Sequence, residues 1–433
     1  MNYNSTVTTG KGLVHFMLSK HKLDLNTRAR QFGEFLTQLK AQEQYAYQRI
    51  LLSATDREVT ILDTYTQRPK QMLMFASNNY LGLANHPDVK QRVKDIVDEY
   101  GTGMGGPPLL NGYSNLMREL EAKIARFKNT EDAIIFPAGF MANLGVVSAL
   151  AQRNDLVIHD QLSHASLHAG LQLSEAEDVR FPHNNTRRLA HLLTKNKSKY
   201  ATIFAAMEGV YSMDGDVAPL HEMVPVCQEH GAVVLLDDAH GIGVLGANGR
   251  GTAEAQGVED GIDVYVGTFS KSFAVSGGYI TGRREIIDYL RYFARPYVFS
   301  AALPPTTLAA VCAGIDVIEQ EPERRANLLD LAAYAADRLQ DYGLQTKPAA
   351  AVLALLVPKD MNIRLANREL HERGIFVNAI EYPAVGVNKQ RFRVSLSANH
   401  TRADIDALAN ALDAIWSNAK FRTSADMKKQ TKA

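Results

Sequence analysis

The most informative stretch of this chain is IDVYVGTFSKSF, residues 262–273, which places Lys271 directly after a short apolar run. Residues 262–267 alternate apolar and small side chains, a pattern typical of a short buried strand. Lys271 should therefore lie just beyond a strand end, among small, hydroxyl-bearing and aromatic residues. Desolvation there disfavours the ammonium form and lowers the pKa of a lysine. The result is an amine able to form a Schiff base with a carbonyl. The alternative is an ordinary lysine that extends from a strand end to solvent.

Short β-rich runs alternate with helical stretches on both sides of this segment, from about residue 120 to residue 280. The expected strands are 133–136, 156–159, 202–205, 233–237, 263–267 and 278–281. Helical patterns lie between several of them, at 116–127, 141–151 and 219–230. Such alternation predicts an α/β fold with a mostly parallel central sheet covered by helices.

Four regions are expected along the chain. Residues 1–70 are polar and helix-leaning, and predict an N-terminal helical arm that packs on another domain or subunit, with membrane contact as the alternative. Residues 71–300 predict the large α/β domain, which also contains a strand at 72–76 and a helix at 87–100. Residues 301–420 predict a smaller α+β C-terminal domain, with helices at 306–319, 326–342 and 401–416 and strands at 352–357 and 391–397. The lysine-rich tail, 421–433, is expected to be disordered.

Composition indicates a soluble protein of enzyme size. The 433 residues suggest two domains, and 46% hydrophobic with 22% charged residues is typical of a globular chain. Lys+Arg and Asp+Glu both number 47, so no net charge attracts nucleic acid or an anionic membrane. The two cysteines are far apart, which argues against a disulfide framework and for a reducing compartment. With no signal-peptide pattern and no apolar run of about 20 residues, the expected location is the cytoplasm.

Two glycine patterns match GxGxxG, at residues 101–106 and 241–246. The first follows an expected helix and runs into two prolines, and the second leads from a strand into a loop. A dinucleotide-binding fingerprint requires a strand, a turn and a helix in that order. Neither pattern therefore supports nicotinamide or flavin binding.

Asp237 and His240 stand at the carboxyl end of the apolar strand 233–237. Open α/β sheets bind ligands at this edge. Asp237 could hold a protonated ring nitrogen and His240 an adjacent hydroxyl of one ring-shaped ligand. A metal pair is one alternative, although no carboxylate or cysteine cluster with ligand spacing stands nearby, so no metal site is expected. Two buried structural polar residues are the other alternative.

Three further motifs carry recognisable chemistry. His164, within HDQLSHASLH at 159–168, is the candidate for an imidazole stacked on a flat cofactor, since the histidine spacing is a weak zinc signal. Residues 136–143, FPAGFMAN, predict a strand, a turn and a helix start whose N–H groups suit a phosphate, although such turns are common without one. Residues 391–395, RFRVS, place two arginines on one strand face, where they could grip a carboxylate or simply face solvent.

Together these motifs resemble the α-oxoamine synthases, a family of fold-type I enzymes that depend on pyridoxal 5'-phosphate. The resemblance covers about residues 75–400 and rests on unrelated motifs in the expected order. They are SNNYLGL at 77–83, AGF at 138–140, SHAS at 163–166, EGVYSMDG at 208–215, DDAHG at 237–241, TFSK at 268–271 and RxSxSAxH at 393–400. It implies a fold-type I aminotransferase-like architecture, pyridoxal phosphate as cofactor, and a homodimer with active sites shared across the interface.

The resemblance also assigns roles to single residues around the cofactor ring. Lys271 would be the Schiff-base lysine and the group that moves the α-proton of the substrate. Asp237 would pair with the pyridinium nitrogen. His240 would hydrogen-bond the ring oxygen, supported by Ser212, and His164 would stack on the ring face. Lys271, His164 and His240 are thus the expected catalytic residues.

The phosphate and the substrate carboxylate have their own expected partners, again implied by the resemblance. The phosphate would be held by Gly139, Phe140, Thr268 and the partner subunit's Ser300. The carboxylate of the amino acid would be held by Asn78 and Arg393.

The implied reaction condenses a small L-amino acid with an acyl thioester, carried by coenzyme A or an acyl carrier protein, and releases carbon dioxide and an α-amino ketone. Residues 267–274, GTFSKSFA, look most like the serine palmitoyltransferase branch, so L-serine and a long-chain acyl group are the expected substrates. L-alanine, as in 8-amino-7-oxononanoate synthase, and glycine, as in 2-amino-3-ketobutyrate CoA ligase, are alternatives. Another fold-type I enzyme, such as an aminotransferase or aldolase, is a further one. A silent partner subunit is disfavoured by the presence of Lys271.

One segment departs from the family pattern. Pro107 and Pro108, within GGPPLLNG at 105–112, stand where relatives commonly carry a serine and an arginine. In the family this segment lies near the acyl chain and the partner subunit. The departure therefore leaves the acyl donor open.

Overall fold

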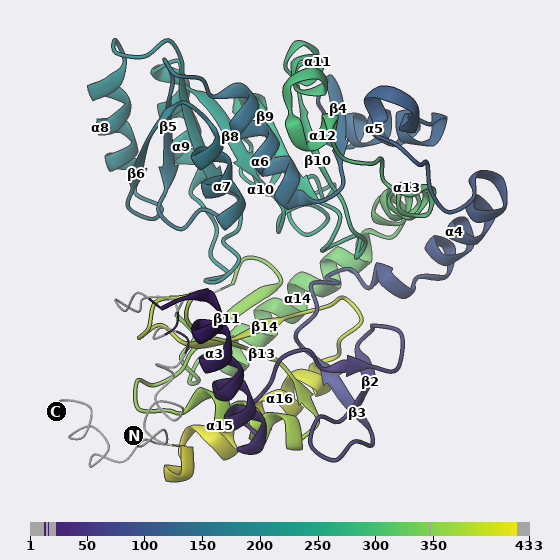
Figure 1. Cartoon of the computed structure of the whole chain (residues 1–433), viewed down its shortest axis with the longest axis vertical. Helices are drawn as coiled ribbons and strands as arrows, with labels where there is room; N and C mark the ends of the chain where they lie inside the picture. The colour runs from purple at the N-terminus through teal and green to yellow at the C-terminus, as the bar shows by residue number, and fades with distance from the viewer. Residues whose placement is uncertain (1–12, 14–15, 17–22, 346–347, 422–433) are drawn as a thin grey trace. The chain divides into compact units, whose positions relative to one another are not determined.

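The computed structural model describes residues 13, 16, 23–345 and 348–421, and the chain forms two compact units (Figure 1). Unit 1 combines the described parts of Met1–Ser77, Leu331–Pro348 and Val352–Ala433, and unit 2 combines Asn78–Asp330 with Ala349–Ala351. The residue boundaries of the two units therefore differ from those of the four predicted regions. One reason is that β3 (Pro69–Met74) pairs with β12 (Ile375–Phe376), which joins the start and the end of the chain in one sheet.

Unit 2 is built on a seven-stranded sheet in the order β4-β10-β9-β8-β7-β5-β6. Its strands are β4 (Asp132–Phe136), β5 (Leu156–Asp160), β6 (Glu177–Phe181), β7 (Ile203–Glu208), β8 (Val233–Asp237), β9 (Val264–Thr268) and β10 (Gly278–Gly282). β10 is antiparallel to both of its neighbours, whereas the other pairs are parallel. The predicted mostly parallel sheet is confirmed. Its central strands are continuous apolar runs because helices cover both faces.

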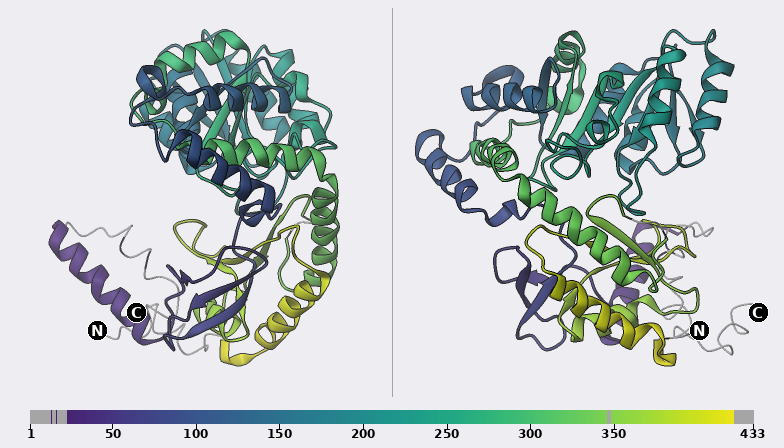
Figure 2. Two further views of the ribbon diagram at one scale, coloured as in Figure 1. Left: turned by 90° about the vertical axis from the view of Figure 1, so that its right-hand side faces the viewer. Right: turned by 180° about the vertical axis from the view of Figure 1, so that it is seen from behind.

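Unit 2 also contains helices, several of which cover the two sides of this sheet (Figure 2). They are α4 (Pro87–Tyr100), α5 (Asn115–Phe127), α6 (Gly139–Leu150), α7 (Ala165–Leu173), α8 (Thr186–Asn196), α9 (Leu220–Glu229), α10 (Thr252–Ala255), α11 (Arg284–Phe293), α12 (Arg295–Val298) and α13 (Pro305–Gln320). Right-handed crossovers between parallel strands place α7 on one face and α8 and α9 on the other. α13 packs on α4 and α5, which explains why it belongs to unit 2 and not to the predicted C-terminal domain. α14 (Pro322–Leu339) begins in unit 2 and ends in unit 1.

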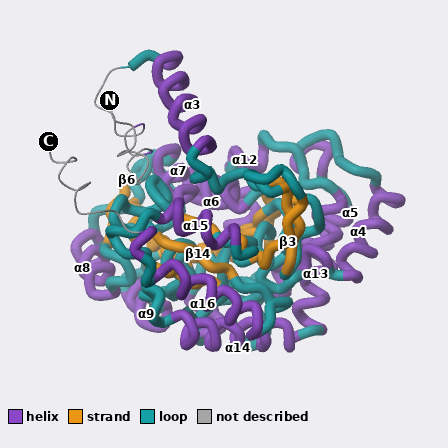
Figure 3. The backbone as a smooth tube through the Cα atoms, turned by 90° about the horizontal axis from the view of Figure 1, so that it is seen from below, coloured by secondary structure: helices purple, strands orange, loops and turns teal. Residues whose placement is uncertain are grey.

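Unit 1 contains two smaller sheets. One has the order β1-β2-β3-β12, with β1 (Ile50–Leu51) and β2 (Glu58–Leu62), and the other has the order β11-β14-β13. The latter consists of β11 (Val352–Leu356), β14 (Arg391–Ser395) and β13 (Asn378–Ile380). The helices are α3 (Leu25–Ala41), α15 (Ile363–Glu372) and α16 (Arg402–Trp416), and Figure 3 shows α15 and α16 over β14. The helical reading of residues 1–70 is therefore incomplete, because β1 and β2 lie within them.

Several sequence expectations concern parts of the chain outside these elements. The predicted disordered tail lies, beyond residue 421, outside the described residues, as does most of the arm before residue 23. Among the helices of the described residues, none has the length and apolar character needed to cross a membrane. Cys227 and Cys312 are both buried free thiols. The cytoplasmic location stays a prediction.

Candidate active site

A pocket of about 320 Å³ opens at the carboxyl ends of β7, β8 and β9, beside the start of α6, all within unit 2. Open α/β sheets bind ligands at this edge. Seven of the predicted site residues line it: Gly139, Phe140, His164, Asp237, His240, Thr268 and Lys271. They come from separate loops spread over more than a hundred positions of sequence, and the topology of the sheet brings them together.

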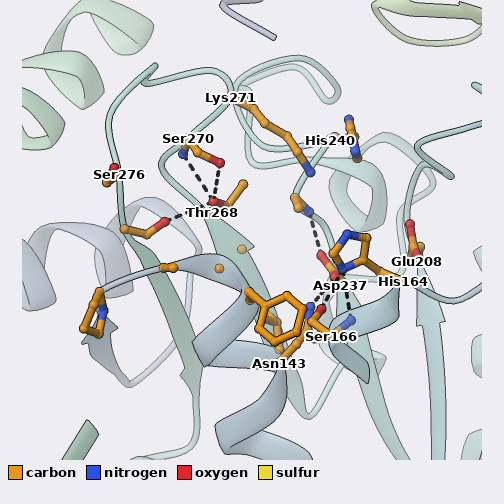
Figure 4. Close-up of a pocket in the computed structure, with 18 residues that line it drawn as sticks. Asn143, His164, Ser166, Glu208, Asp237, His240, Thr268, Ser270, Lys271 and Ser276 are labelled. Carbon is orange, nitrogen blue, oxygen red and sulfur yellow. Dashed lines mark hydrogen bonds between the residues drawn. The ribbon is translucent and has the colours of Figure 1, made fainter. Parts of the chain in front are cut away.

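Lys271 lies in the loop that links β9 to β10. Phe269 N–H donates to the Gly277 carbonyl at 2.9 Å and closes this loop, while Ser272 Oγ donates to the Ile242 carbonyl at 2.6 Å. The loop is thus anchored on both sides of the lysine. Lys271 is half-buried and extends into the pocket toward Asp237 and His164 (Figure 4). The lowered pKa expected for Lys271 stays a prediction.

Asp237, the last residue of β8, is held by two N–H donors. Asn143 Nδ2 donates to Oδ2 at 2.5 Å, and the backbone N–H of Ala239 donates to Oδ1 at 3.0 Å. These two donors fix the orientation of the Asp237 carboxyl group, which faces the pocket.

His164 caps the N-terminus of α7, and its ring is accessible from the pocket. The backbone N–H of Ser166 donates to Nδ1 at 3.3 Å, and Ser166 Oγ lies 2.7 Å from the same nitrogen. Because Nδ1 accepts these hydrogen bonds, the ring proton resides on Nε2. Partial desolvation lowers the pKa of His164, which the Asp237 charge opposes and the Lys271 charge reinforces. A neutral imidazole with an accessible face therefore lies beside the carboxylate.

His240 is buried and connected to the predicted substrate residue Asn78 through Tyr80. The Tyr80 hydroxyl lies 2.7 Å from His240 Nδ1 and 3.2 Å from Asn78 Oδ1. Tyr80 has no exposed surface. Its hydroxyl therefore fixes the orientation of the His240 ring.

The opposite end of the pocket carries hydroxyl groups and the start of α6 (Figure 4). Thr268 Oγ1 lies 2.9 Å from Ser270 Oγ and donates to the Gly277 carbonyl at 3.0 Å. Ala138, at the N-cap of α6, has no side-chain acceptor for the first N–H groups of that helix. A Cβ at Gly139 would lie 2.7 Å from Thr268 Cβ, so only glycine lets the two segments approach. Helix N–H groups beside hydroxyls suit a phosphate.

Four predicted residues do not line the pocket: Ser212, Ser300, Asn78 and Arg393. Ser212 lies in the loop after β7, and Ser300 follows α12. Arg393 belongs to β14 in unit 1, whereas Asn78 belongs to unit 2. Arg391 and Arg393 are 2% and 5% exposed, so the alternative of a solvated charged strand face is wrong. The roles predicted for these four residues stay predictions.

Other pocket residues were given no role in the sequence analysis. They are chiefly Asn143, Ser166, Glu208, Ser270 and Ser276. Tyr80 does not line the pocket but contacts His240 through its hydroxyl. Glu208 offered a signal that was missed, since it is a carboxylate at the end of a buried strand, like Asp237. Two groups of histidine and acidic residues elsewhere in the described chain, Asp63–His371–Glu372 and His86–Asp88–Glu321, contain none of the predicted site residues.

The chemistry of the pocket fits pyridoxal phosphate. An amine for the carbonyl, a carboxylate for the ring nitrogen and an imidazole for the ring face lie at one end. Hydroxyls and helix N–H groups for a phosphate lie at the other. The two ends carry complementary groups in the arrangement that this cofactor requires.

Comparison with known proteins agrees with this fit. The model of the family described as aminotransferase class I and II matches residues 70–412. The 8-amino-7-oxononanoate synthase of Geotalea daltonii is 38% identical over 384 residues, which cover 88% of this chain and 96% of that protein. The solved serine palmitoyltransferase of Sphingomonas wittichii has a TM-score of 0.84 and 34% identity, over 91% of this chain and 98% of the other. The 8-amino-7-oxononanoate synthase of Francisella tularensis has a TM-score of 0.68 and 27% identity, over 81% and 98%.

The chain belongs to the class I and II aminotransferase family, with the fold-type I architecture expected from its motifs. Within that family it is an α-oxoamine synthase, an acyltransferase that depends on pyridoxal phosphate. A serine palmitoyltransferase structure of the same fold, 34% identical, holds this cofactor. The predicted family, fold class and cofactor are thereby confirmed.

Proposed function

We propose that this enzyme condenses L-serine with a long-chain acyl thioester, with loss of carbon dioxide, to form an α-amino ketone. The observation that carries the proposal is the structural similarity to serine palmitoyltransferase, with a TM-score of 0.84 against 0.68 for the 8-amino-7-oxononanoate synthase of F. tularensis. Residues 267–274 around Lys271 support the same branch. Coenzyme A and an acyl carrier protein are both compatible acyl carriers.

A second candidate substrate is L-alanine. It is favoured by the 38% identity to the G. daltonii 8-amino-7-oxononanoate synthase, which exceeds the 34% identity to the serine palmitoyltransferase. Glycine is the third small amino acid that the family pattern allows. The three differ only in a methyl or hydroxymethyl group, a difference that pocket contacts decide.

The residues around the pocket would divide the chemistry as follows. When bound, pyridoxal phosphate supplies an electron sink for the electrons released at the α-carbon of the amino acid. Lys271 holds the cofactor carbonyl between turnovers and moves the α-proton. Asp237, oriented by its two N–H donors, keeps the ring nitrogen protonated. The neutral His164 covers the ring face, and His240, with Ser212, holds the ring oxygen.

The remaining contacts concern the phosphate and the carboxylate. We assign the phosphate to Gly139, Phe140 and Thr268, because helix N–H groups and a hydroxyl meet there. Asn78 and Arg393 are assigned to the carboxylate of the amino acid. A buried arginine suits this role because its planar guanidinium binds a carboxylate in bidentate fashion.

The proposal includes a homodimer in which the partner subunit's Ser300 reaches the phosphate. Large apolar side chains are exposed on elements of unit 2 that pack on one another, namely α6, α11, α12 and η2 (Pro108–Gly112). They include Phe140, Leu110, Tyr292, Phe293 and Phe299, of which Leu110 and Phe299 are 80% and 81% exposed. Exposed apolar surface of this kind supports a protein–protein interface. It adjoins the pocket through Phe140.

The amino acid and acyl donor can be tested together. The visible absorption of the cofactor-loaded protein is titrated with L-serine, L-alanine and glycine, and release of carbon dioxide and free thiol is then measured with long-chain and short-chain acyl thioesters. A saturable response to serine, with product only from long-chain donors, is expected. A response to alanine or glycine alone would refute the choice of serine and leave the reaction class standing.

The role of Lys271 has its own test. Lys271→Ala should abolish both the visible band and product formation, while Lys195→Ala, on the exposed surface of α8, should leave both unchanged. Product formation by Lys271→Ala at the wild-type rate would contradict the proposed chemistry.

A further inference from the structure

Glu208 and Asp237 are carboxyl neighbours on adjacent parallel strands. They end β7 and β8, and their Cα positions pair directly across the two strands. Paired residues on neighbouring strands point to the same face of a sheet, and the strands lie about 5 Å apart. Both residues line the pocket. Two negative charges this close would repel each other, which favours a proton on one of the two groups.

The surroundings of the two groups decide which one is ionised. Asp237 is half-buried and accepts hydrogen bonds from Asn143 and from the Ala239 N–H. Glu208 is 5% exposed. Its Oε1 has no hydrogen-bond partner within the described part of the chain. Donors and solvent favour a carboxylate, whereas burial favours the neutral acid. Of the two positions, that of Asp237 is therefore the better suited to a negative charge.

We propose that Glu208 works as a protonated carboxylic acid and leaves the negative charge of the pair on Asp237. This inference rests on the proposed function, in which Asp237 serves the ring nitrogen. Burial raises the pKa of Glu208 well above its usual value, the Asp237 charge raises it further, and Lys271 opposes both effects. A second carboxylate would favour the charged forms of the two neighbouring bases, His164 and Lys271. The proposed reaction uses both bases in their neutral forms.

A small void beside Glu208 has room for a water molecule that would accept a hydrogen bond from its carboxyl group. It has a volume of about 10 Å³, and its lining includes Glu208, Ser163, His164 and Asp237. Such a volume has room for about one water molecule where polar partners are present. Ser163 Oγ is buried and, like Glu208 Oε1, has no hydrogen-bond partner among the described residues. A water in this void would accept from Glu208 and donate to Ser163.

Infrared difference spectroscopy of the cofactor-loaded full chain tests the charge of Glu208 directly. Glu208→Gln keeps the size and polarity of the side chain but cannot ionise. Glu222→Gln, at an exposed position of α9, is the matched control. Between about pH 6 and about pH 8, the difference spectrum of wild type minus Glu208→Gln should show the carbonyl band of a protonated acid. The difference spectrum of wild type minus Glu222→Gln should instead show carboxylate bands. Carboxylate bands in the Glu208→Gln difference would overturn the proposal.

Cofactor binding gives a second test of the neutral acid. Glu208→Gln, which is neutral at every pH, should bind pyridoxal phosphate within about 2-fold of wild type, with the same pH midpoint of the visible band. A shifted midpoint in Glu208→Gln would overturn the proposal.

The outcomes also separate this inference from the proposed function. A wild-type chain that takes up no pyridoxal phosphate would refute the proposed function. The infrared comparison, repeated on the unloaded protein, would still decide whether Glu208 carries a proton.

Discussion

Replacement of Lys128 by methionine should destabilise the protein strongly, because it leaves the carboxyl of Asp238 buried without its cation. The Lys128 and Asp238 side chains are 1% and 0% exposed, and Nζ lies 3.5 Å from Oδ2. Lys128 also donates to the Arg250 carbonyl and lies over the Tyr265 ring, 4.3 Å from its centroid. Burial raises the pKa of Asp238 and lowers that of Lys128, and each partner opposes the shift of the other.

The magnitude follows from the groups that stay after the substitution. Removal of one partner from a buried ion pair costs about 3–5 kcal/mol. Asp238 keeps two donors, the N–H and the hydroxyl of Thr252, at 2.9 and 2.7 Å, which favours the lower end of that range. The lost cation–π contact is desolvated and adds up to about 2 kcal/mol, whereas methionine preserves most of the apolar packing of the lysine stem. Lys128→Met should therefore lower the free energy of unfolding by about 3–5 kcal/mol.

Urea denaturation of three variants tests this expectation. Arg153→Met is the matched control, because Arg153 pairs with Glu175 at 3.2 Å while both side chains are largely exposed, at 80% and 68%. Its cost should stay below about 1 kcal/mol. The double variant Lys128→Met/Asp238→Asn carries neither charge and should recover most of the loss.

Two results would contradict this account of the pair. One is a cost for Lys128→Met within about 1 kcal/mol of the Arg153→Met control. The other is a double variant no more stable than the single one, which would mean that the charge of Asp238 is not the source of the loss. The pair matters for the site because Asp238 lies between Asp237 and His240 in the chain, inside the turn that orients both.

Three smaller changes test other contacts. Tyr80→Phe removes the hydroxyl beside His240 and should lower kcat/KM about 10-fold, whereas Tyr200→Phe, which removes an exposed hydrogen bond to Glu177, should leave it unchanged; equal values would contradict the positioning role of Tyr80. His183 lies between two aspartates, and its pKa is raised to about 10. The stabilisation that protonated His183 contributes to the fold should therefore be complete below about pH 6.5 and lost as the pH rises through about 10. In unfolding measurements, His183→Gln should cost about 2 kcal/mol near neutral pH and little above pH ~10. Thr401→Ala, which removes the capping box of α16, should cost about 1 kcal/mol in thermal unfolding, while Thr401→Ser should cost little.

The parts of the fold that were predictable are those with strong local patterns. The helix expected at 87–100 is α4 with the same limits, since a proline at its first position and a glycine after its last mark both ends. The strands of the central sheet were also anticipated, because buried parallel strands are continuous apolar runs. β6 was missed because it is a polar edge strand, exposed along most of its length. β1 and β2 were missed because β1 is only two residues long and pairs with β2, and β2 pairs with β3, so that each depends on its partner strand.

Some residues of the candidate site could likewise be predicted from local motifs, whereas others could not. Local motifs indicated Lys271, Asp237, His164 and the start of α6, because each is a polar group or helix start placed directly after an apolar strand. Nothing local indicates that Tyr80 orients His240, a contact between residues 160 positions apart. Nor could the pattern RFRVS decide whether its arginines are buried, since alternation looks the same on a solvated and on a covered face.

The identity and order of the reactive groups are properties of the sequence alone, and they were enough to indicate the family, the fold class and the cofactor. Burial and hydrogen bonding are properties of the tertiary structure, because they depend on which distant segments pack around a group. Glu208 illustrates the difference. As a letter in EGVYSMDG it is one more acidic residue, and only its place beside Asp237 and away from solvent makes it a candidate for a neutral acid.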